Sequence, residues 1–145
     1  MTNQQKKIIF TFQQIDIVFD ALISIDPKLK ISFSDYLANV YNGDNSERLS
    51  YIDIGEIARY INNNLKVGQT QFFQTFFETV EHILKNCDSY IEDLIVVGLF
   101  ESIQNISGSE IYYQSGFDNW LQPLSKLKWD NLIDSWEGNE WRTSK

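Results

Sequence analysis

The sequence predicts an all-α fold, a single-domain bundle of about six helices spanning residues 1–145. Apolar residues recur every three or four positions in almost every segment, whereas the alternation typical of strands is scarce. The chain is 43% hydrophobic and 14% aromatic, which argues against disorder and suffices for one sizeable core. We therefore expect helices throughout and a loose tail only from about residue 139.

The first helix is expected to end before Asp26-Pro27, because the residue preceding a proline is disfavoured in the helical region. Its apolar stripe consists of Ile8, Phe12, Ile15, Phe19, Leu22 and Ile23. A shorter second helix follows, with Ser34 as its N-cap and Gly43 as its stop. Its apolar positions are Phe33, Tyr36, Leu37, Val40 and Tyr41.

The third helix is expected to begin at Ser50, which forms an approximate capping box with Asp53. Its core stripe consists of Tyr51, Ile54, Ile57, Ala58, Ile61 and Leu65. We expect the Asn62-Asn63-Asn64 run to fray this helix and Gly68 to lie in the connection that follows. The fourth helix has a broad apolar face made of Phe72, Phe73, Phe76, Phe77, Val80, Ile83 and Leu84. Its other side carries Gln74, Glu78, Glu81, His82 and Lys85.

The fifth helix is expected from Tyr90 to about Ile106, opened by a capping box of Ser89 and Glu92. Because residues 94–100 are apolar all round, we place this helix at the centre of the bundle. Gly98 inside it costs about 1 kcal/mol relative to alanine. We interpret this glycine as a point of close approach by another helix.

A glycine- and serine-containing loop is expected over residues 107–119, with residues 111–113 packing back on the body. The last helix opens at Pro123, because proline suits the first helical position, and stops at Gly138. Its apolar stripe consists of Leu124, Leu127, Trp129, Leu132, Ile133 and Trp136. No fixed repeat is visible, which disfavours a solenoid.

The net charge of −8 is concentrated in the middle of the chain. Residues 1–77 and residues 111–145 each carry a net charge of −1, whereas residues 78–110 carry −6. Such a field repels nucleic acid and anionic lipid and attracts a basic protein surface. We therefore predict a partner-binding site at Asp88, Glu92, Asp93 and Glu101. The alternative is that the acids only keep the protein soluble.

Glu101 stands out because an acid in so apolar a helix must be hydrogen-bonded, paired or exposed at a groove. A structural partner such as Arg59 would explain it. The functional alternative is an anchor for a lysine or arginine of a partner.

Enzymatic chemistry has little support, and we predict no catalytic residue, metal or cofactor. No glycine-rich phosphate loop is present. Cys87 and His82, the only thiol and imidazole, lie five residues apart and on different faces of one helix. Glu78 with His82 supplies at most two metal ligands, and Glu92 with Glu101 lacks any supporting motif for acid–base catalysis.

The sequence also predicts a cytoplasmic protein. A single cysteine permits no internal disulfide, so nothing indicates an oxidising compartment. Acids and glutamines interrupt the N-terminal apolar stretch too soon for a signal peptide, and no run reaches the length of a membrane span.

The C-terminal 60 residues resemble a family of small, acidic, functionally uncharacterised bacterial proteins. The resemblance lies in Leu94-Ile-Val-Val-Gly-Leu-Phe-Glu101, Gln104-Asn105, Leu121-Gln-Pro-Leu-Ser125, Trp129 and Ile133-Asp-Ser-Trp136. Some members look like immunity proteins of polymorphic or contact-dependent toxin systems. The resemblance implies a protein that binds and neutralises a cognate toxin, a basic one given the acidic surface. The alternative function is a helical adaptor or regulatory domain with no enzymatic activity.

Overall fold

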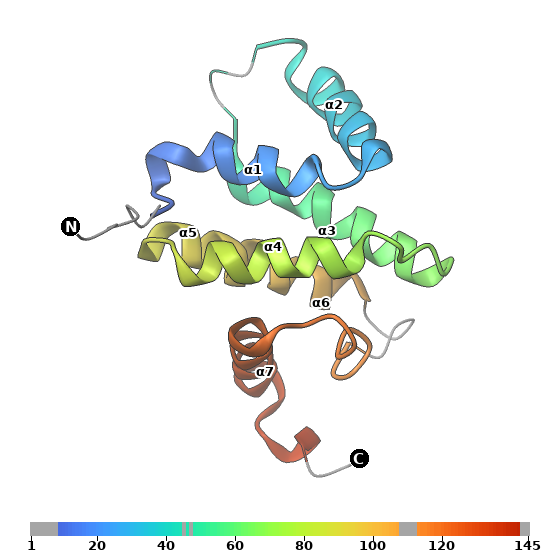
Figure 1. Ribbon diagram of the computed structural model, residues 1–145, viewed down its shortest axis with the longest axis vertical. Coiled ribbons are helices and arrows are strands. Elements are labelled where there is room, and N and C mark those ends of the chain that lie inside the picture. The colour runs from blue at the N-terminus through green and yellow to red at the C-terminus, as the bar shows by residue number, and fades with distance from the viewer. Residues whose placement is uncertain (1–8, 45, 47, 108–112, 143–145) are drawn as a thin grey trace, which may run out of the picture.

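The described residues fold into six helices, with the contiguous α5, η2 and α6 counted as one, and the predicted all-α class is confirmed. Figure 1 shows how they are arranged. The computed structural model describes residues 9–44, 46, 48–107 and 113–142. Within these ranges there is no strand, and the sole β-type pairing is an isolated bridge between Phe10 and Cys87. The elements are η1 Phe12–Gln14, α1 Ile15–Ile23, α2 Pro27–Tyr41, α3 Ser50–Lys66, α4 Phe73–Lys85, α5 Ser89–Asp93, η2 Leu94–Phe100, α6 Glu101–Ser107, α7 Pro123–Glu137 and η3 Glu140–Arg142.

The first helix begins later than its apolar stripe predicts. The backbone N–H of Phe10 donates to the carbonyl of Asn86 at 2.6 Å, and the N–H of Asp88 donates to the carbonyl of Phe10 at 2.9 Å. A residue that forms this bridge cannot also continue the helix, so α1 starts at Ile15 after a short 3₁₀ turn. Ile8 lies outside the described residues. The predicted end before Asp26 is confirmed, since α1 stops at Ile23.

The second helix is longer than predicted, because Asp26-Pro27 opens it. Asp26 accepts a hydrogen bond from the N–H of Leu29 at 3.2 Å, and Pro27 occupies the first helical position. The predicted cap at Ser34 is therefore wrong. The helix ends where Asn42 adopts a left-handed φ of 52°, immediately before the predicted stop at Gly43.

The third helix does not fray at its asparagines. Asn62 is buried and donates to the carbonyls of Ala58 and Ile103, at 3.1 and 3.2 Å, while accepting from the hydroxyl of Ser107. This side chain therefore joins α3 to α6, and the helix continues to Lys66. The predicted capping box is also wrong, because Leu49 is the N-cap residue and Asp53 is buried among other partners.

The predicted fifth helix is present as α5, η2 and α6 in uninterrupted succession, and it packs along α3. Its cap is Asp88, which accepts from the N–H of Ile91 at 2.9 Å, rather than Ser89. Leu94–Phe100 adopts a π-helical conformation. A Cβ on Gly98 would lie 2.9 Å from the Ile54 side chain, so the predicted close approach is confirmed.

The fourth and last helices are confirmed at the predicted positions, and Glu81 connects them. Glu81 is 6% exposed, so its predicted place on the solvent side of α4 is wrong. Its carboxylate accepts from the N–H of Leu124 at 2.9 Å, and from the N–H and hydroxyl of Ser125 at 2.8 and 2.7 Å. Because the first N–H groups of a helix have no partner within it, Glu81 acts as the N-cap of α7 from another helix.

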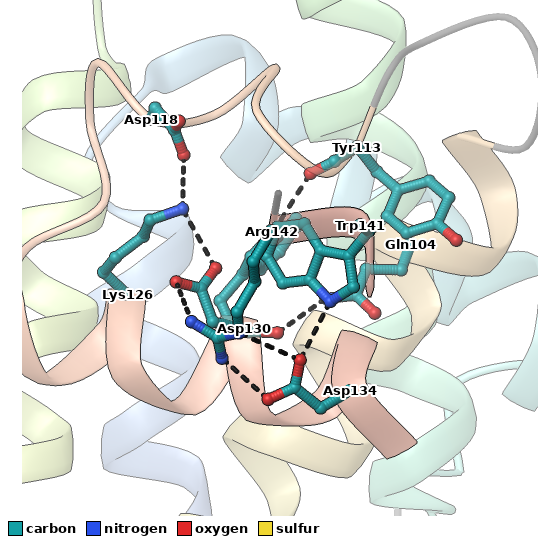
Figure 2. Close-up of polar contacts among 9 residues, drawn as sticks. Gln104, Tyr113, Asp118, Lys126, Asp130, Asp134, Trp141 and Arg142 are labelled. Carbon is teal, nitrogen blue, oxygen red and sulfur yellow. Dashed lines mark hydrogen bonds and ion pairs between the residues drawn. The ribbon is translucent and has the colours of Figure 1, made fainter. Parts of the chain in front are cut away.

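The described part of the C-terminal tail is packed on α7, although we expected it to be loose from about residue 139. Trp141 is buried, and its indole N–H donates to Asp134 at 2.8 Å (Figure 2). Arg142 binds the same carboxylate at 2.7 Å and approaches Asp130 at 3.7 Å. Lys126 joins Asp130 to Asp118 in the preceding loop. Of the loop residues predicted to pack back, Ile111 and Tyr112 lie outside the described residues and Tyr113 is half-buried.

Candidate protein-binding site

A groove lies between α2, α3 and α6, with a volume of about 510 Å³. We call it the α2–α3–α6 groove. Its lining residues are Tyr36, Val40, Tyr51, Ile52, Gly55, Glu56, Arg59, Ser102, Asn105 and Ile106. A second hollow of about 370 Å³ shares Tyr51 and Ile52 with it and extends the concave surface toward Tyr90. The size is in the range of sites that receive side chains or small ligands.

The groove exposes large apolar side chains to solvent. Val40, Tyr51 and Ile52 are 51%, 40% and 60% exposed, respectively. Tyr90 of α5 stands edge-to-face with Tyr51, at 6.4 Å between ring centroids. Single exposed apolar residues need no explanation, but a group of them around a concavity is typical of a surface that another molecule covers.

Two small residues from neighbouring helices, Gly55 and Ser102, are among those that line the groove. Gly55 of α3 faces Ser102 of α6, and a Cβ on Gly55 would lie 3.8 Å from the Ser102 hydroxyl, an ordinary van der Waals distance. Gly98 differs, because a Cβ there would collide with Ile54. Packing of α3 against its neighbour therefore requires a glycine at Gly98 but not at Gly55.

A buried carboxylate fixes the α2 wall of the groove to α3. Asp53 accepts from the hydroxyls of Tyr36 and Tyr41, at 2.9 and 2.7 Å, and from Nε of Arg48 at 2.9 Å. The Arg48 guanidinium also lies 4.9 Å above the Phe19 ring centroid, which is cation–π geometry. Burial and the bond to Asp53 raise the pKa of Tyr36 far above its ordinary value, so this phenol remains a donor.

A second carboxylate holds the opposite end of α2. The Tyr60 hydroxyl donates to Asp26 at 2.6 Å. Burial and this hydrogen bond raise the pKa of Tyr60 to about 12. Since α2 buries only Leu29 and Phe33 fully, these polar contacts at its two ends carry much of its attachment.

Two unpaired acids lie beside the groove. Within the described ranges the Glu101 carboxylate has no hydrogen bond or ion pair, and the residue shares a helix face with the lining residue Asn105, four positions on. Asp93 is exposed, and its charge contributes to the raised pKa of Tyr51 after the larger effect of burial. The lining acid Glu56 is paired with Arg59 at 2.6 Å, so the predicted structural partner of Glu101, Arg59, is bound to another acid.

The four predicted binding residues do not share one face. Asp88 caps α5, and Glu92 lies 3.3 Å from Lys128 of α7. Only Asp93 and Glu101 stand beside the groove without a salt bridge. The acids of residues 78–110 are thus divided: two contact α7, one caps a helix and two lie beside the groove, while Glu78 is exposed on α4 and Glu110 lies outside the described residues.

Sequence reasoning missed the apolar part of this site. Tyr51 was expected in the core stripe of α3, but it is among the exposed large side chains. Two signals were present in the sequence: Ile52 is an apolar residue off that stripe, and Gly55 interrupts a helix interior. Val40 carried no signal, because it fits the stripe of α2 equally well.

The two other side chains with reactive groups, Cys87 and His82, do not lie in the groove. Burial, with the charges of Glu92 and Asp88, raises the pKa of Cys87 to about 11, which leaves the thiol protonated and poorly nucleophilic. His82 packs its ring edge-to-face with Phe10 at 6.0 Å. Among the residues that the structure describes, no three His, Cys, Asp or Glu side chains gather as a metal site requires. No helix in those ranges is long and apolar enough to cross a membrane.

Comparison with known proteins places the chain in a family. Residues 19–137 match the model of a family described as "Domain of unknown function (DUF7674)". The match covers α2 to α7 completely and most of α1, and so extends well beyond the C-terminal 60 residues that carry the resemblance noted above. No curated protein and no solved structure matches the chain. With its helices from α2 to α7 inside the match, this chain belongs to the DUF7674 family.

Proposed function

We propose that this protein is an immunity protein, which binds a cognate basic toxin domain in the cytoplasm and neutralises it by occluding its active surface. The observation that carries the proposal is the α2–α3–α6 groove, a concavity with exposed aromatic and aliphatic walls and unpaired acids beside it. The C-terminal resemblance to immunity-like proteins supports the same class.

The proposed mechanism is stoichiometric and divides between charge and apolar contact. A net charge of −8 attracts a basic domain and accelerates its encounter. Burial of Val40, Tyr51 and Ile52 at the interface then slows dissociation, because apolar and aromatic side chains dominate binding free energy at interface centres. No bond is made or broken in this mechanism.

The test is co-expression of the tagged protein with the product of the gene immediately upstream. We expect rescue of growth and a stable complex of the two chains on purification. Reversal of Asp93 and Glu101 to lysine should weaken the complex, whereas Glu78→Lys, an exposed site on α4, should not. Absence of both rescue and complex would contradict the immunity function.

The second candidate is a helical adaptor whose acidity serves only solubility. The apolar lining of the groove favours this function, because an adaptor needs an exposed aromatic groove but no charge complementarity. Salt-insensitive capture of a partner would support the adaptor. Capture that weakens as salt increases would support the immunity protein.

A further inference from the structure

We infer that the α2–α3–α6 groove receives one large apolar side chain of a partner polypeptide over Gly55 and Ser102, with a lysine or arginine beside it paired to Glu101. This inference rests on the proposal that the groove binds a protein. It adds the chemistry of the occupant and the residue, Gly55, that keeps the groove open.

The first step concerns Gly55. Glycine inside a helix is unfavourable relative to alanine, and Gly55 lies in the interior of the 17-residue helix α3. Its backbone is not among the glycines with positive φ, so its conformation does not require glycine. A Cβ on Gly55 would lie 3.8 Å from the Ser102 hydroxyl, so packing does not require a glycine here either.

The second step concerns the space above that position. Gly55 and Ser102 line the groove together with the apolar side chains of Val40, Ile52 and Ile106. Any larger residue at Gly55 would project into it. The missing side chain thus keeps the groove empty without any benefit to the fold, and apolar walls favour an apolar occupant.

The third step concerns charge. Glu101 has no partner in the described chain and lies on the same helix face as Asn105, which lines the groove. The other groove acid, Glu56, is already neutralised by Arg59. An occupant with a basic residue next to its apolar one would therefore satisfy Glu101, whereas an acidic occupant would be repelled by it.

The experiment is a selection of short random peptides displayed on phage, with wild-type protein as bait. We expect enriched peptides to carry a leucine, phenylalanine or similar side chain close to a lysine or arginine. Synthetic peptides of that sequence should bind Gly55→Leu roughly thirtyfold more weakly or worse, the loss typical of an excluded hot-spot residue. Glu101→Lys should weaken them roughly fivefold.

Two matched variants control for general effects. Gln74→Leu adds the same side chain at an exposed position of α4, and Glu78→Lys makes the same charge reversal on that helix. Both should bind the peptides like wild type. Thermal unfolding of Gly55→Leu should show a melting temperature at or above wild type, which separates a filled groove from a misfolded protein.

Three results would overturn the inference: no enriched peptide, enriched peptides without the joint apolar and basic signature, or equal binding by Gly55→Leu. Toxin capture distinguishes the two proposals. If peptides behave as expected but the upstream product is not bound, the immunity function fails and the groove inference stands. If the toxin is bound equally by wild type and Gly55→Leu, the groove inference fails and the immunity function stands.

Discussion

At the scale of single residues, buried carboxylates that accept several hydrogen bonds organise this fold. Glu81 caps α7 from α4, and Asp53 gathers two tyrosines and an arginine from α2 and the loop that follows it. Removal of such an acceptor leaves several buried donors unsatisfied at once, which costs more than the loss of one hydrogen bond. These positions should therefore be sensitive to isosteric substitutions.

We expect Glu81→Gln to lower the free energy of unfolding by about 2 kcal/mol, because an amide cannot accept from all three donors of α7 with the strength of a carboxylate. Urea denaturation followed by circular dichroism would measure this. Glu78→Gln, three residues earlier and exposed on the same helix, should change stability by less than about 0.5 kcal/mol. Equal effects of the two variants would contradict the capping role.

The same carboxylate predicts a pH dependence. Burial raises the pKa of Glu81, but the hydrogen bonds from Leu124 and Ser125 and the charge of Lys85 outweigh it, so the pKa lies below its ordinary 4.5. Its stabilising effect is therefore fully present above pH 4.5 and is lost as the pH falls through the lower, folded-state pKa. Wild type should lose more stability than Glu81→Gln on acidification across that range. Parallel pH profiles for the two proteins would be inconsistent with this assignment.

We expect Asp53→Asn to lower the free energy of unfolding by about 3 kcal/mol, because it leaves the largely buried Arg48 guanidinium with only the exposed Asp16, at 3.8 Å, as a counter-charge. Chemical denaturation would measure the loss. Asp20→Asn, at an exposed site of α1, is the matched control and should be near neutral. Hydrogen exchange should show faster exchange of α2 amides in Asp53→Asn than in wild type; unchanged α2 protection would argue against a role for Asp53 in holding the groove wall.

At the scale of elements, the pairing of α3 with the helix formed by α5, η2 and α6 decides both the core and the groove. Ile54 packs onto Gly98 in the interior, while Gly55, the next residue along α3, faces Ser102 at the surface. The same interface therefore contains two glycines with different effects. Gly98 permits close packing, whereas Gly55 leaves a concavity.

This difference predicts opposite effects of the same substitution. Gly55→Ala should raise the free energy of unfolding by about 1 kcal/mol, because alanine is the better helix former and its Cβ fits at 3.8 Å. Gly98→Ala should lower it by about 1 kcal/mol, since a contact of 2.9 Å with Ile54 forces the core to shift by more than the helix propensity repays. Differential scanning calorimetry of both variants would test the pair. Stabilisation by Gly98→Ala, or destabilisation by Gly55→Ala, would contradict the packing described.

At the scale of the whole molecule, the acidic charge should act on the rate of encounter with a basic partner. We expect the association rate constant with the upstream gene product to fall about tenfold from low to physiological salt, with a small change in the dissociation rate constant. Stopped-flow fluorescence would measure both constants. Glu101→Lys should flatten the salt dependence more than Glu78→Lys, because Glu101 lies beside the groove. A salt-independent association rate would favour the adaptor function.

The helical class and most helix positions follow from the sequence, because helix formation depends on local apolar periodicity, caps and prolines. Phe72 to Leu84 predicts α4 almost completely, and Pro123 and Gly138 bound α7 as expected. Gly98 also indicated a close approach by another helix, because a glycine is unfavourable in a helix interior unless close packing needs it, and the structure shows Ile54 there. Errors arose where a polar side chain had two possible partners: Asp53 fits a local capping box, yet it is buried against residues from another helix.

Which charged and aromatic residues share a surface depends instead on how the helices pack. The acidic stretch of residues 78–110 is continuous in the sequence, but Glu81 turns into the core, Glu92 turns to α7, and Asp93 and Glu101 lie beside the groove. Tyr36, Tyr51 and Asn105 come from three separate helices and line one concavity. Local periodicity fixes the face of a helix on which a residue lies, whereas the neighbour that this face meets depends on packing between helices distant in the chain.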